Sequence, residues 1–296
     1  MYHYVRPDNP EYPYFNYLNL DVFRRQLDYF QSKYGFLSKQ EYFDSIDNNK
    51  TPDGVVLTFD DGFKDHYQYV LPELKKRNLW GLFYISTNVY TSKQLLGVHR
   101  IHYLKGKYGA SEIVKEAINM VDDHMLDHET IKAFDKEIYL QSSYGESEKQ
   151  LRRMFNYYIS YDHRDEILDK LMSKYFDEDQ LCKEVYLDIE EIREISESGS
   201  VIGSHTVNHK VLSRLSFAEQ EYEIHQSFHF LNSNVGLKKF CFCYPYGYKA
   251  SYNNDTLNIL ENLEVHNAVI FDNQPQNSDV KRYELSRLDC NQFMEV

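Results

Sequence analysis

The chain has 296 residues, enough for one large α/β domain or two ordinary ones, and 42% of them are hydrophobic, which supports a sizeable core. With 33 Lys and Arg residues against 46 Asp and Glu residues, the net charge is −13. So acidic a chain gains no counterion-release energy from nucleic acid and has no general attraction to an anionic membrane surface, which disfavours both classes of partner.

The cysteine content and the opening residues indicate the class of protein and its cellular location. The chain has four cysteines, too few for a disulfide scaffold at this length: Cys182, Cys241, Cys243 and Cys290. Cys241 and Cys243 are interpreted as small side chains on one face of a strand, because no further soft metal ligand is adjacent. The opening residues lack the basic start and apolar core of a signal peptide, and no apolar run approaches a membrane span. We therefore expect a soluble, cytoplasmic protein.

The first third of the chain alternates between β-prone and helical patterns. A β-prone piece at 2–5 and a loop at 9–15 precede a helix with regularly spaced apolar residues that stops at Gly35. Residues 54–59 predict a strand, residues 66–78 a helix, and residues 80–86 another strand. This alternation indicates parallel strands joined by helical crossovers.

The middle of the chain interrupts this pattern. From about Ser92 to Glu184 the strand signal is weak and the charge is high, which predicts a helical insertion at about 92–184 with helices near 111–126 and 147–159. The alternation then resumes. Its elements are helices over 186–199, 217–236 and 251–265, and strands over 200–206, 238–247, 267–272 and 282–289. About seven β/α units predict an α/β fold, a distorted (β/α)7-type barrel, as a single domain over residues 1–296.

Two adjacent carboxylates, Asp60 and Asp61, follow the strand at 54–59 and precede Gly62. An Asx-turn or a helix N-cap would account for them without any chemistry. Active sites of parallel barrels, however, lie at the carboxyl ends of the strands, which is where this pair is predicted to be.

Two histidines follow a second predicted strand. His205 and His209 are four residues apart, so on a helical turn their imidazoles would share one face and could meet one metal ion. Two unrelated surface histidines are the alternative in a chain that has 12 of them. Together with a carboxylate at another strand end, they predict a metal site with open coordination positions, as hydrolytic and oxygenase metals require.

The Pro-Tyr-Gly stretch within 243–249 is either an ordinary turn or one that presents a backbone N–H.

These stretches resemble the motifs of a known family. TFDDG, HTVNH and YPYG occur in the order and context of the polysaccharide deacetylases, the NodB-like members of carbohydrate esterase family 4. The resemblance covers most of the chain apart from the insertion. It implies hydrolytic removal of an acetyl group, usually from an N-acetylated amino sugar, by metal-activated water with an Asp general base.

The resemblance also implies roles for individual residues. Asp60 matches the catalytic base, and Tyr246 matches the residue whose backbone N–H helps to form the oxyanion hole. The three metal ligands match Asp61, His205 and His209. The expected ion is zinc, with cobalt, nickel or manganese as alternatives. One carboxylate would then bind the cation and the other would accept a proton from water, which gives a reason for placing two like charges side by side.

Two parts of the family pattern are missing. The family often has an arginine where Cys243 stands; Arg287 could orient the base from another side, or it is an ordinary strand-end arginine. The late histidine that supplies a general acid is also absent, because no histidine follows His266. That residue begins a predicted strand and should lie at the wrong end of the barrel.

Other histidines are candidates for the missing acid. We prefer His3, at the end of a short first strand, as a site-lining and catalytic residue. His99 and His102 follow the strand at 80–86 and could also reach the site, although each alone is more often structural. The acid itself stays unassigned, with Asp60 or water as further alternatives.

The leading hypothesis is a metal-dependent deacetylase of an N-acetylated sugar, either in a glycan or in a nucleotide- or lipid-linked precursor, at a cytoplasmic step of surface glycan synthesis. A second is cleavage of another small amide or an O-acetyl ester at the same site. A third is a catalytically weak glycan-binding module, which the missing motifs favour and the intact ligands and base oppose. A two-carboxylate glycosidase fits poorly, because adjacent residues at one strand end would not flank a glycosidic bond. The sugar and the oligomeric state are left open.

Overall fold

The computed structural model of the protein describes residues 1–134, 144–272 and 281–296. The chain divides into two compact units. One, here called the sheet unit, comprises Met1–Pro7, Tyr17–Ser92 and Lys183–Val296; the other, the helical unit, comprises Asp8–Asn16 and Lys93–Cys182. The expected single domain with an insertion at about 92–184 stays a prediction, and residues 135–143 of that stretch lie outside the described residues.

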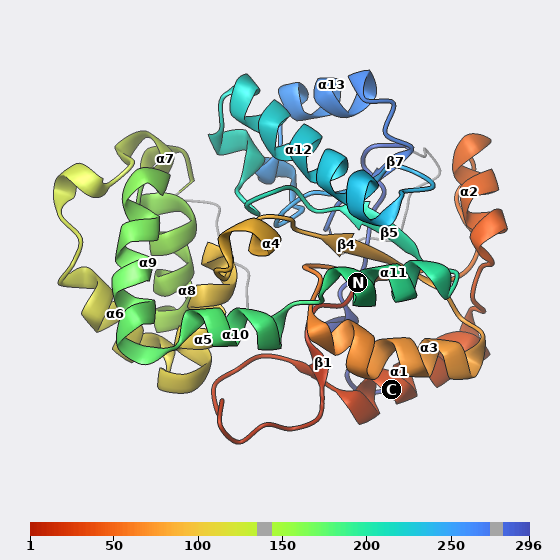
Figure 1. Ribbon diagram of the computed structural model, residues 1–296, viewed down its shortest axis with the longest axis horizontal. Helices are drawn as coiled ribbons and strands as arrows, with labels where there is room; N and C mark the ends of the chain where they lie inside the picture. Colours follow the sequence, from red (N-terminus) through yellow and green to blue (C-terminus); the bar gives the residue numbers. More distant parts are fainter. Residues whose placement is uncertain (135–143, 273–280) are drawn as a thin grey trace. The chain divides into compact units, whose positions relative to one another are not determined.

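A parallel sheet of five short strands organises the sheet unit (Figure 1). In spatial order the strands are β3 (Leu57–Phe59), β4 (Gly81–Ile85), β5 (Val201–Ser204), β6 (Cys241–Cys243) and β7 (Asn267–Val269). Their residues are almost all buried, as apolar strands of a sheet covered on both faces should be. The sheet curls into a half-barrel, which confirms the predicted α/β class and distorted barrel.

Both edges of this sheet are extended by single residues. Tyr2 bridges β3 and Leu285 bridges β7, each in parallel. The amino group of Met1 then donates a hydrogen bond of 2.7 Å to the carbonyl of Leu288. The first residues of the chain and the segment near 288 therefore meet at the open side of the half-barrel.

The predicted last strand over 282–289 is reduced to the bridge at Leu285. Leu285 N–H donates to Ala268 and its carbonyl accepts from Ile270, as in a parallel ladder. The next acceptor, the Ile270 carbonyl, instead receives the side-chain Nε of Arg287 at 3.2 Å. The strand ends here because a guanidinium occupies the place of the next backbone donor.

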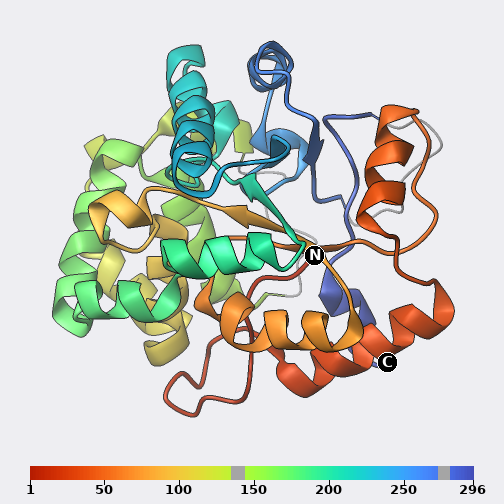
Figure 2. The same ribbon diagram turned by 45° about the vertical axis from the view of Figure 1, so that its right-hand side comes forward.

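Helices cover the outside of the sheet. They are α1 (Leu20–Lys33), α2 (Lys39–Asp47), α3 (Leu71–Arg77), α4 (Val89–Ser92), α11 (Ile189–Glu197), α12 (Phe217–Val235) and α13 (Asn254–Asn262). α1, α3 and α11 lie along one flank and α12 and α13 along another (Figures 1 and 2). A small parallel pair, β1 (Val5–Arg6) and β2 (Leu18–Asn19), precedes α1.

Two helical details differ from the sequence analysis. The helix expected over 66–78 begins as a π-helical turn, His66–Val70, and continues as α3 with Pro72 in its first turn, where a missing N–H is tolerated. No element was predicted between Gly35 and the strand at 54–59, yet α2 lies there, with the reciprocal hydrogen bonds of a capping box between Ser38 and Glu41.

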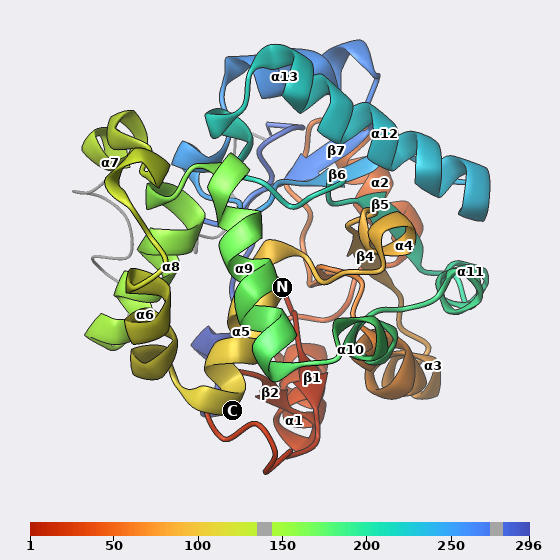
Figure 3. The same ribbon diagram turned by 60° about the vertical axis from the view of Figure 1, so that its left-hand side comes forward.

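The helical unit is built from α5 (Gly97–Tyr108), α6 (Ala110–Ile118), α7 (His128–Phe134), α8 (Glu146–Arg153), α9 (Tyr161–Tyr175) and most of α10 (Glu178–Val185). Within it α5 packs on α6 and α9, and α6 packs on α8 (Figure 3). The helices expected over 111–126 and 147–159 are shorter, at α6 and α8, each followed by a 3₁₀ or π turn. Within the described parts of the chain, no helix has both the length and the apolar character needed to cross a membrane.

Candidate metal centre

The turn after β3 carries both carboxylates. Asp61 has a left-handed backbone, with φ +78°, and Gly62 follows at +71°. An aspartate held in this conformation stores backbone strain that the surrounding structure must support, a feature that clusters at functional sites. Asp60 and Asp61 are both buried, at 2% and 4% exposure, so each carboxylate requires a partner of opposite charge.

The loop after β5 supplies the two histidines. It is irregular, so the helical turn behind the spacing argument is absent: Thr206 and His209 have φ values of +65° and +53°. The Thr206 hydroxyl accepts a 3.0 Å bond from the His209 N–H and stabilises this fold of the loop. The imidazole rings of His205 and His209 come to 4.7 Å between centroids.

Asp61, His205 and His209 form a buried cluster. Oδ1 of Asp61 lies 3.4 Å from Nε2 of His205 and 3.4 Å from Nε2 of His209. One ligand atom from each residue lies within 4.8 Å of the other two. One carboxylate and two imidazoles are donors that suit a divalent ion such as zinc and leave positions open. The residues present therefore fit the predicted metal.

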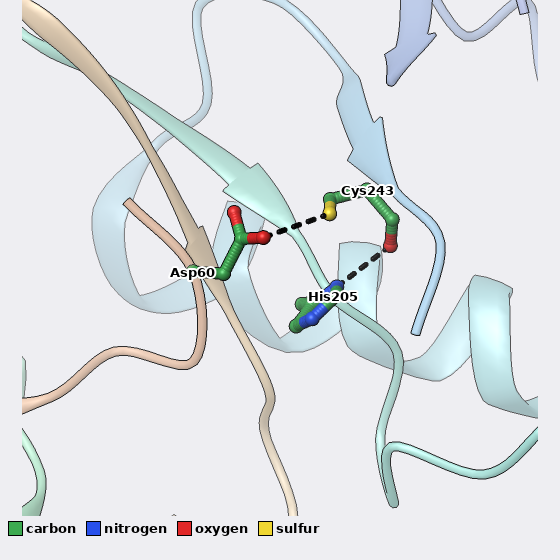
Figure 4. Close-up of side chains that lie close together, drawn as sticks. All are labelled: Asp60, His205 and Cys243. Atoms are coloured by element: carbon green, nitrogen blue, oxygen red, sulfur yellow. Dashed lines mark hydrogen bonds between the residues drawn. The ribbon is translucent and has the colours of Figure 1, made fainter. Parts of the chain in front are cut away.

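A hydrogen bond made by the ring nitrogen that faces away from Asp61 fixes the orientation of His205. Its Nδ1 lies 2.7 Å from the backbone carbonyl of Cys243 (Figure 4). Because a carbonyl only accepts, Nδ1 donates a proton to it, and Nε2 is the nitrogen that faces Asp61. A metal-binding histidine usually has such a partner behind it.

A second group of three potential ligands shares His205. Figure 4 shows Asp60 and His205 both linked to Cys243, one through its thiol, 3.6 Å from Asp60 Oδ2, and the other through its carbonyl. Arg287, however, places a guanidinium nitrogen 3.1 Å from the same sulfur, where it would repel a metal cation. Burial also raises the pKa of the Cys243 thiol, which disfavours the ligating thiolate. The cluster around Asp61 is the better metal site.

Arg287 reaches the site from the segment after Leu285. One guanidinium nitrogen donates to Asp60 Oδ1 at 2.7 Å and to Thr58 Oγ1 at 3.1 Å. Burial alone would raise the pKa of Asp60, but the charge of Arg287, helped by nearby histidines, holds that pKa well below its usual range. Asp60 is therefore an anion at neutral pH.

Tyr246 and His3 also lie at this cluster. Tyr246 has φ +64°, and its ring centroid is 5.0 Å from that of His209. His3 Nε2 lies 3.8 Å from Asp60 Oδ2 and 4.0 Å from Asp61 Oδ2, and its side chain is 42% exposed. The structure thus gathers all seven residues that the sequence analysis proposed for the site.

The profile of the polysaccharide deacetylase family matches residues 47–163 and 171–268, well over half of the chain. The chain belongs to the polysaccharide deacetylase family. No protein with a curated description matches this family member significantly.

Several solved structures share the fold of this chain. The deacetylase PplD of Streptococcus pyogenes, in complex with acetate, has 20% identity and a TM-score of 0.59, covering 97% of this chain and 89% of its own. IcaB from Ammonifex degensii has 19% identity and a TM-score of 0.53, with coverages of 97% and 88%. The BpsB deacetylase domain from Bordetella bronchiseptica has 14% identity and a TM-score of 0.52, with coverages of 95% and 87%. At these identities the likeness establishes the fold.

The other histidines considered as acids belong to other elements of the chain. His266 stands at the start of β7, where its Nε2 is 2.9 Å from Asp47 Oδ1. His99 and His102 are on α5 of the helical unit, with His99 fully buried.

Glu223, on α12, is a residue that the sequence analysis missed. Its Oε2 accepts from the backbone N–H groups of Val207 and Asn208 at 3.0 and 2.7 Å, and its Oε1 accepts from the Asn208 side chain at 2.6 Å. A buried carboxylate therefore holds the stretch between His205 and His209. Nothing in the sequence marks it, because a single glutamate on an amphipathic helix carries no motif.

Proposed function

We propose that this member of the polysaccharide deacetylase family removes the acetyl group from an N-acetylated amino sugar, in a glycan or a sugar precursor, in a metal-dependent hydrolysis. The observation that carries the proposal is the buried cluster of Asp61, His205 and His209 beside Asp60, an ionised carboxylate paired with Arg287. A site for metal-assisted hydrolysis needs these parts: three ligands with open positions and a separate base.

The ligands would be Asp61, His205 and His209, and a divalent ion bound there would polarise the acetyl carbonyl and acidify water. Asp60 accepts the proton as the water oxygen adds to the acetyl carbon. Arg287 donates a hydrogen bond to Oδ1 of Asp60 and so keeps the carboxylate ionised and oriented. Oδ2 is then the oxygen that would accept the proton.

Tyr246 and His3 complete the proposed roles. The backbone N–H of Tyr246, in its left-handed turn against His209, would donate to the developing oxyanion. His3, beside both carboxylates and partly open to solvent, would protonate the amine nitrogen as the C–N bond breaks. The products are then acetate and a free amino sugar.

The contact between Arg287 and Asp60 favours an enzyme over a glycan-binding module. Two departures from the family pattern favour the module: Cys243 replaces an arginine, and the late histidine is missing. Arg287, from a different segment, contacts the base Asp60 in place of that arginine. The replacement at Cys243 therefore no longer argues against an enzyme. A cytoplasmic location and a nucleotide- or lipid-linked substrate belong to the same proposal and rest on the sequence alone.

The test is acetate release from N-acetylated sugars, nucleotide sugars and short glycans, with O-acetyl esters and simple amides beside them. The protein is loaded with zinc, cobalt, nickel or manganese, and Asp60→Asn and His205→Ala are compared with matched controls at exposed positions, Asp53→Asn and His229→Ala. Metal-dependent acetate from an N-acetyl sugar, lost in the two site variants only, is the expected result. Release from esters or simple amides alone would move the assignment to those substrates. No release by a metal-loaded protein would contradict an enzymatic function.

A further inference from the structure

Backbone hydrogen bonds attach the first residues of the chain beside the site. Tyr2 donates its N–H to the Thr58 carbonyl at 2.8 Å and accepts from the Asp60 N–H at 3.0 Å. The carbonyl of Tyr4 accepts from Leu18 N–H at 2.9 Å. His3 lies between these anchored residues, so its neighbours cannot move without breaking sheet-like hydrogen bonds.

Two side chains from the start of the π-helical turn hold the remaining backbone of this segment. His66 Nε2 lies 2.8 Å from the carbonyl of His3. Asp65 Oδ2 accepts from the N–H of Val5 at 3.1 Å and from Nε of Arg6 at 2.7 Å. Both His66 and Asp65 are buried. We call these two residues the clamp.

The ring of His66 is itself immobilised. It packs against Phe59, Phe63 and Phe83, with ring centroids 5.5 to 5.8 Å away. Burial lowers the pKa of His66 to about 4, so the ring is neutral at neutral pH. Since a carbonyl only accepts, the proton of this neutral ring is on Nε2, and His66 donates to His3. The donor is fixed both in position and in tautomer.

The clamp adds a second set of contacts to this segment. Hydrogen bonds of Tyr2 and Tyr4 already attach the segment to the sheet unit, and a buried polar pair is a costly way to add stability. The clamp bears on His3 in two ways: His66 holds its carbonyl and Asp65 holds Val5 and Arg6, while the imidazole of His3 lies beside the two carboxylates and is partly open to solvent. Small displacements of a catalytic group are costly in rate.

We propose that Asp65 and His66 are positioning residues that hold the His3 imidazole at the site, so that it delivers a proton to the leaving amine. This inference rests on the proposed function. In the step, the bond between the acetyl carbon and nitrogen breaks, the nitrogen keeps the electron pair, and the proton on His3 Nε2 passes to it.

The leaving group separates this role from a structural one. An amine must be protonated to depart, whereas 4-nitrophenolate departs unassisted. Loss of a positioned acid should therefore slow acetate release from an N-acetyl sugar and spare hydrolysis of 4-nitrophenyl acetate at the same site. A general loss of folding or of metal would slow both reactions together.

The experiment compares zinc-loaded wild type with His66→Phe, which keeps an aromatic ring but removes the donor, and His66→Gln, which keeps a donor of similar reach. Tyr67→Phe is the matched control, since it removes a hydrogen bond to Glu194 from the same helical turn. His3→Ala and the double variant His3→Ala with His66→Phe complete the set. Zinc content and amide hydrogen exchange over residues 2–6 are measured for each protein.

We expect His3→Ala to lower kcat on the N-acetyl sugar about 100-fold and His66→Phe about tenfold or more, with little change on 4-nitrophenyl acetate. His66→Gln should recover most of the loss, and the double variant should be no slower than His3→Ala. Amide exchange at residues 2–6 should be faster in His66→Phe while zinc content is unchanged.

Equal losses on both substrates, or a double variant slower than His3→Ala by the full factor of His66→Phe, would overturn the positioning role. Should His66→Phe fail to fold, Asp65→Ala tests the other half of the clamp, and unchanged kcat with unchanged amide exchange at Val5 would overturn it equally. These results require an active wild type. A wild type that releases no acetate from any N-acetyl sugar instead overturns the proposed function, and the role of the clamp with it.

Discussion

At the residue scale, the pairing of Asp60 with Arg287 combines stability and function. Both side chains are buried, and the guanidinium also contacts Thr58. Removing one partner leaves the other as an uncompensated buried charge, which costs about 3–5 kcal/mol, whereas removing both charges costs far less. We therefore expect Arg287→Met to lower the free energy of unfolding by about that amount, and Asp60→Asn combined with Arg287→Met to restore much of it.

Urea unfolding of the metal-free proteins measures this. Arg25→Met is the control, because Arg25 is exposed and its loss should change the unfolding free energy by less than about 0.5 kcal/mol. A double variant as unstable as Arg287→Met would mean that Arg287 acts through packing and not through the charge of Asp60.

His66 gives the protein a specific sensitivity to acid. Burial lowers its pKa from 6.5 to about 4. Between these values the unfolded state binds a proton that the folded state does not, so the free energy of unfolding falls as the pH falls from about 6.5 toward 4. Between pH 7 and pH 5 this histidine should cost about 2 kcal/mol of stability. In urea unfolding at both pH values, the wild type should lose about that much more than His66→Gln; equal losses would show that His66 is not the group responsible.

At the element scale, the metal loop is shaped by the helix that follows it. Glu223 of α12 accepts from Val207 and Asn208, between the two histidine ligands. A neutral amide cannot satisfy all three donors, so Glu223→Gln should loosen the loop and lower zinc affinity about 10- to 100-fold. Competition with a chromophoric chelator measures this affinity. Glu221→Gln, the same change at an exposed position of α12, should leave it unaltered, and equal affinities in the two variants would contradict the role of Glu223.

The elements also show what the sequence could predict. Asp60, Asp61, His205 and His209 were placed correctly at strand ends, because apolar runs followed by polar residues locate the carboxyl edge of a parallel sheet. The helix α2 is not predicted, although Ser38 and Glu41 have the spacing of a capping box, because the helical segment that follows Ser38 is short.

Contacts made through the fold were harder to predict. The sequence does not distinguish a base-orienting role for Arg287 from that of an ordinary strand-end arginine, because only its long-range contacts separate the two. Glu223, Asp65 and His66 could not be found at all. They act on backbone groups of segments 15 to 63 residues away, and no local periodicity records such a partner.

At the scale of the whole molecule, the cluster joins segments that are distant in the chain. Asp61 comes from the turn after the first strand of the main sheet, and His205 and His209 come from the loop after its third strand. Residues 93–182 of the helical unit lie between them in sequence. An ion that binds all three residues binds the folded state and has no comparable site in the unfolded chain. Its binding energy therefore adds to global stability by mass action.

We expect zinc at about 100 times its dissociation constant to raise the free energy of unfolding by about 2.7 kcal/mol, and a chelator to reverse the gain. His209→Ala should abolish most of this increase, because two ligands hold the ion far less tightly than three. His229→Ala, an exposed histidine on α12, is the matched control and should retain the full effect. Urea unfolding with and without zinc measures all three proteins. An equal gain in His209→Ala and wild type would place the stabilising ion at another site and contradict the assignment of the cluster as the metal centre.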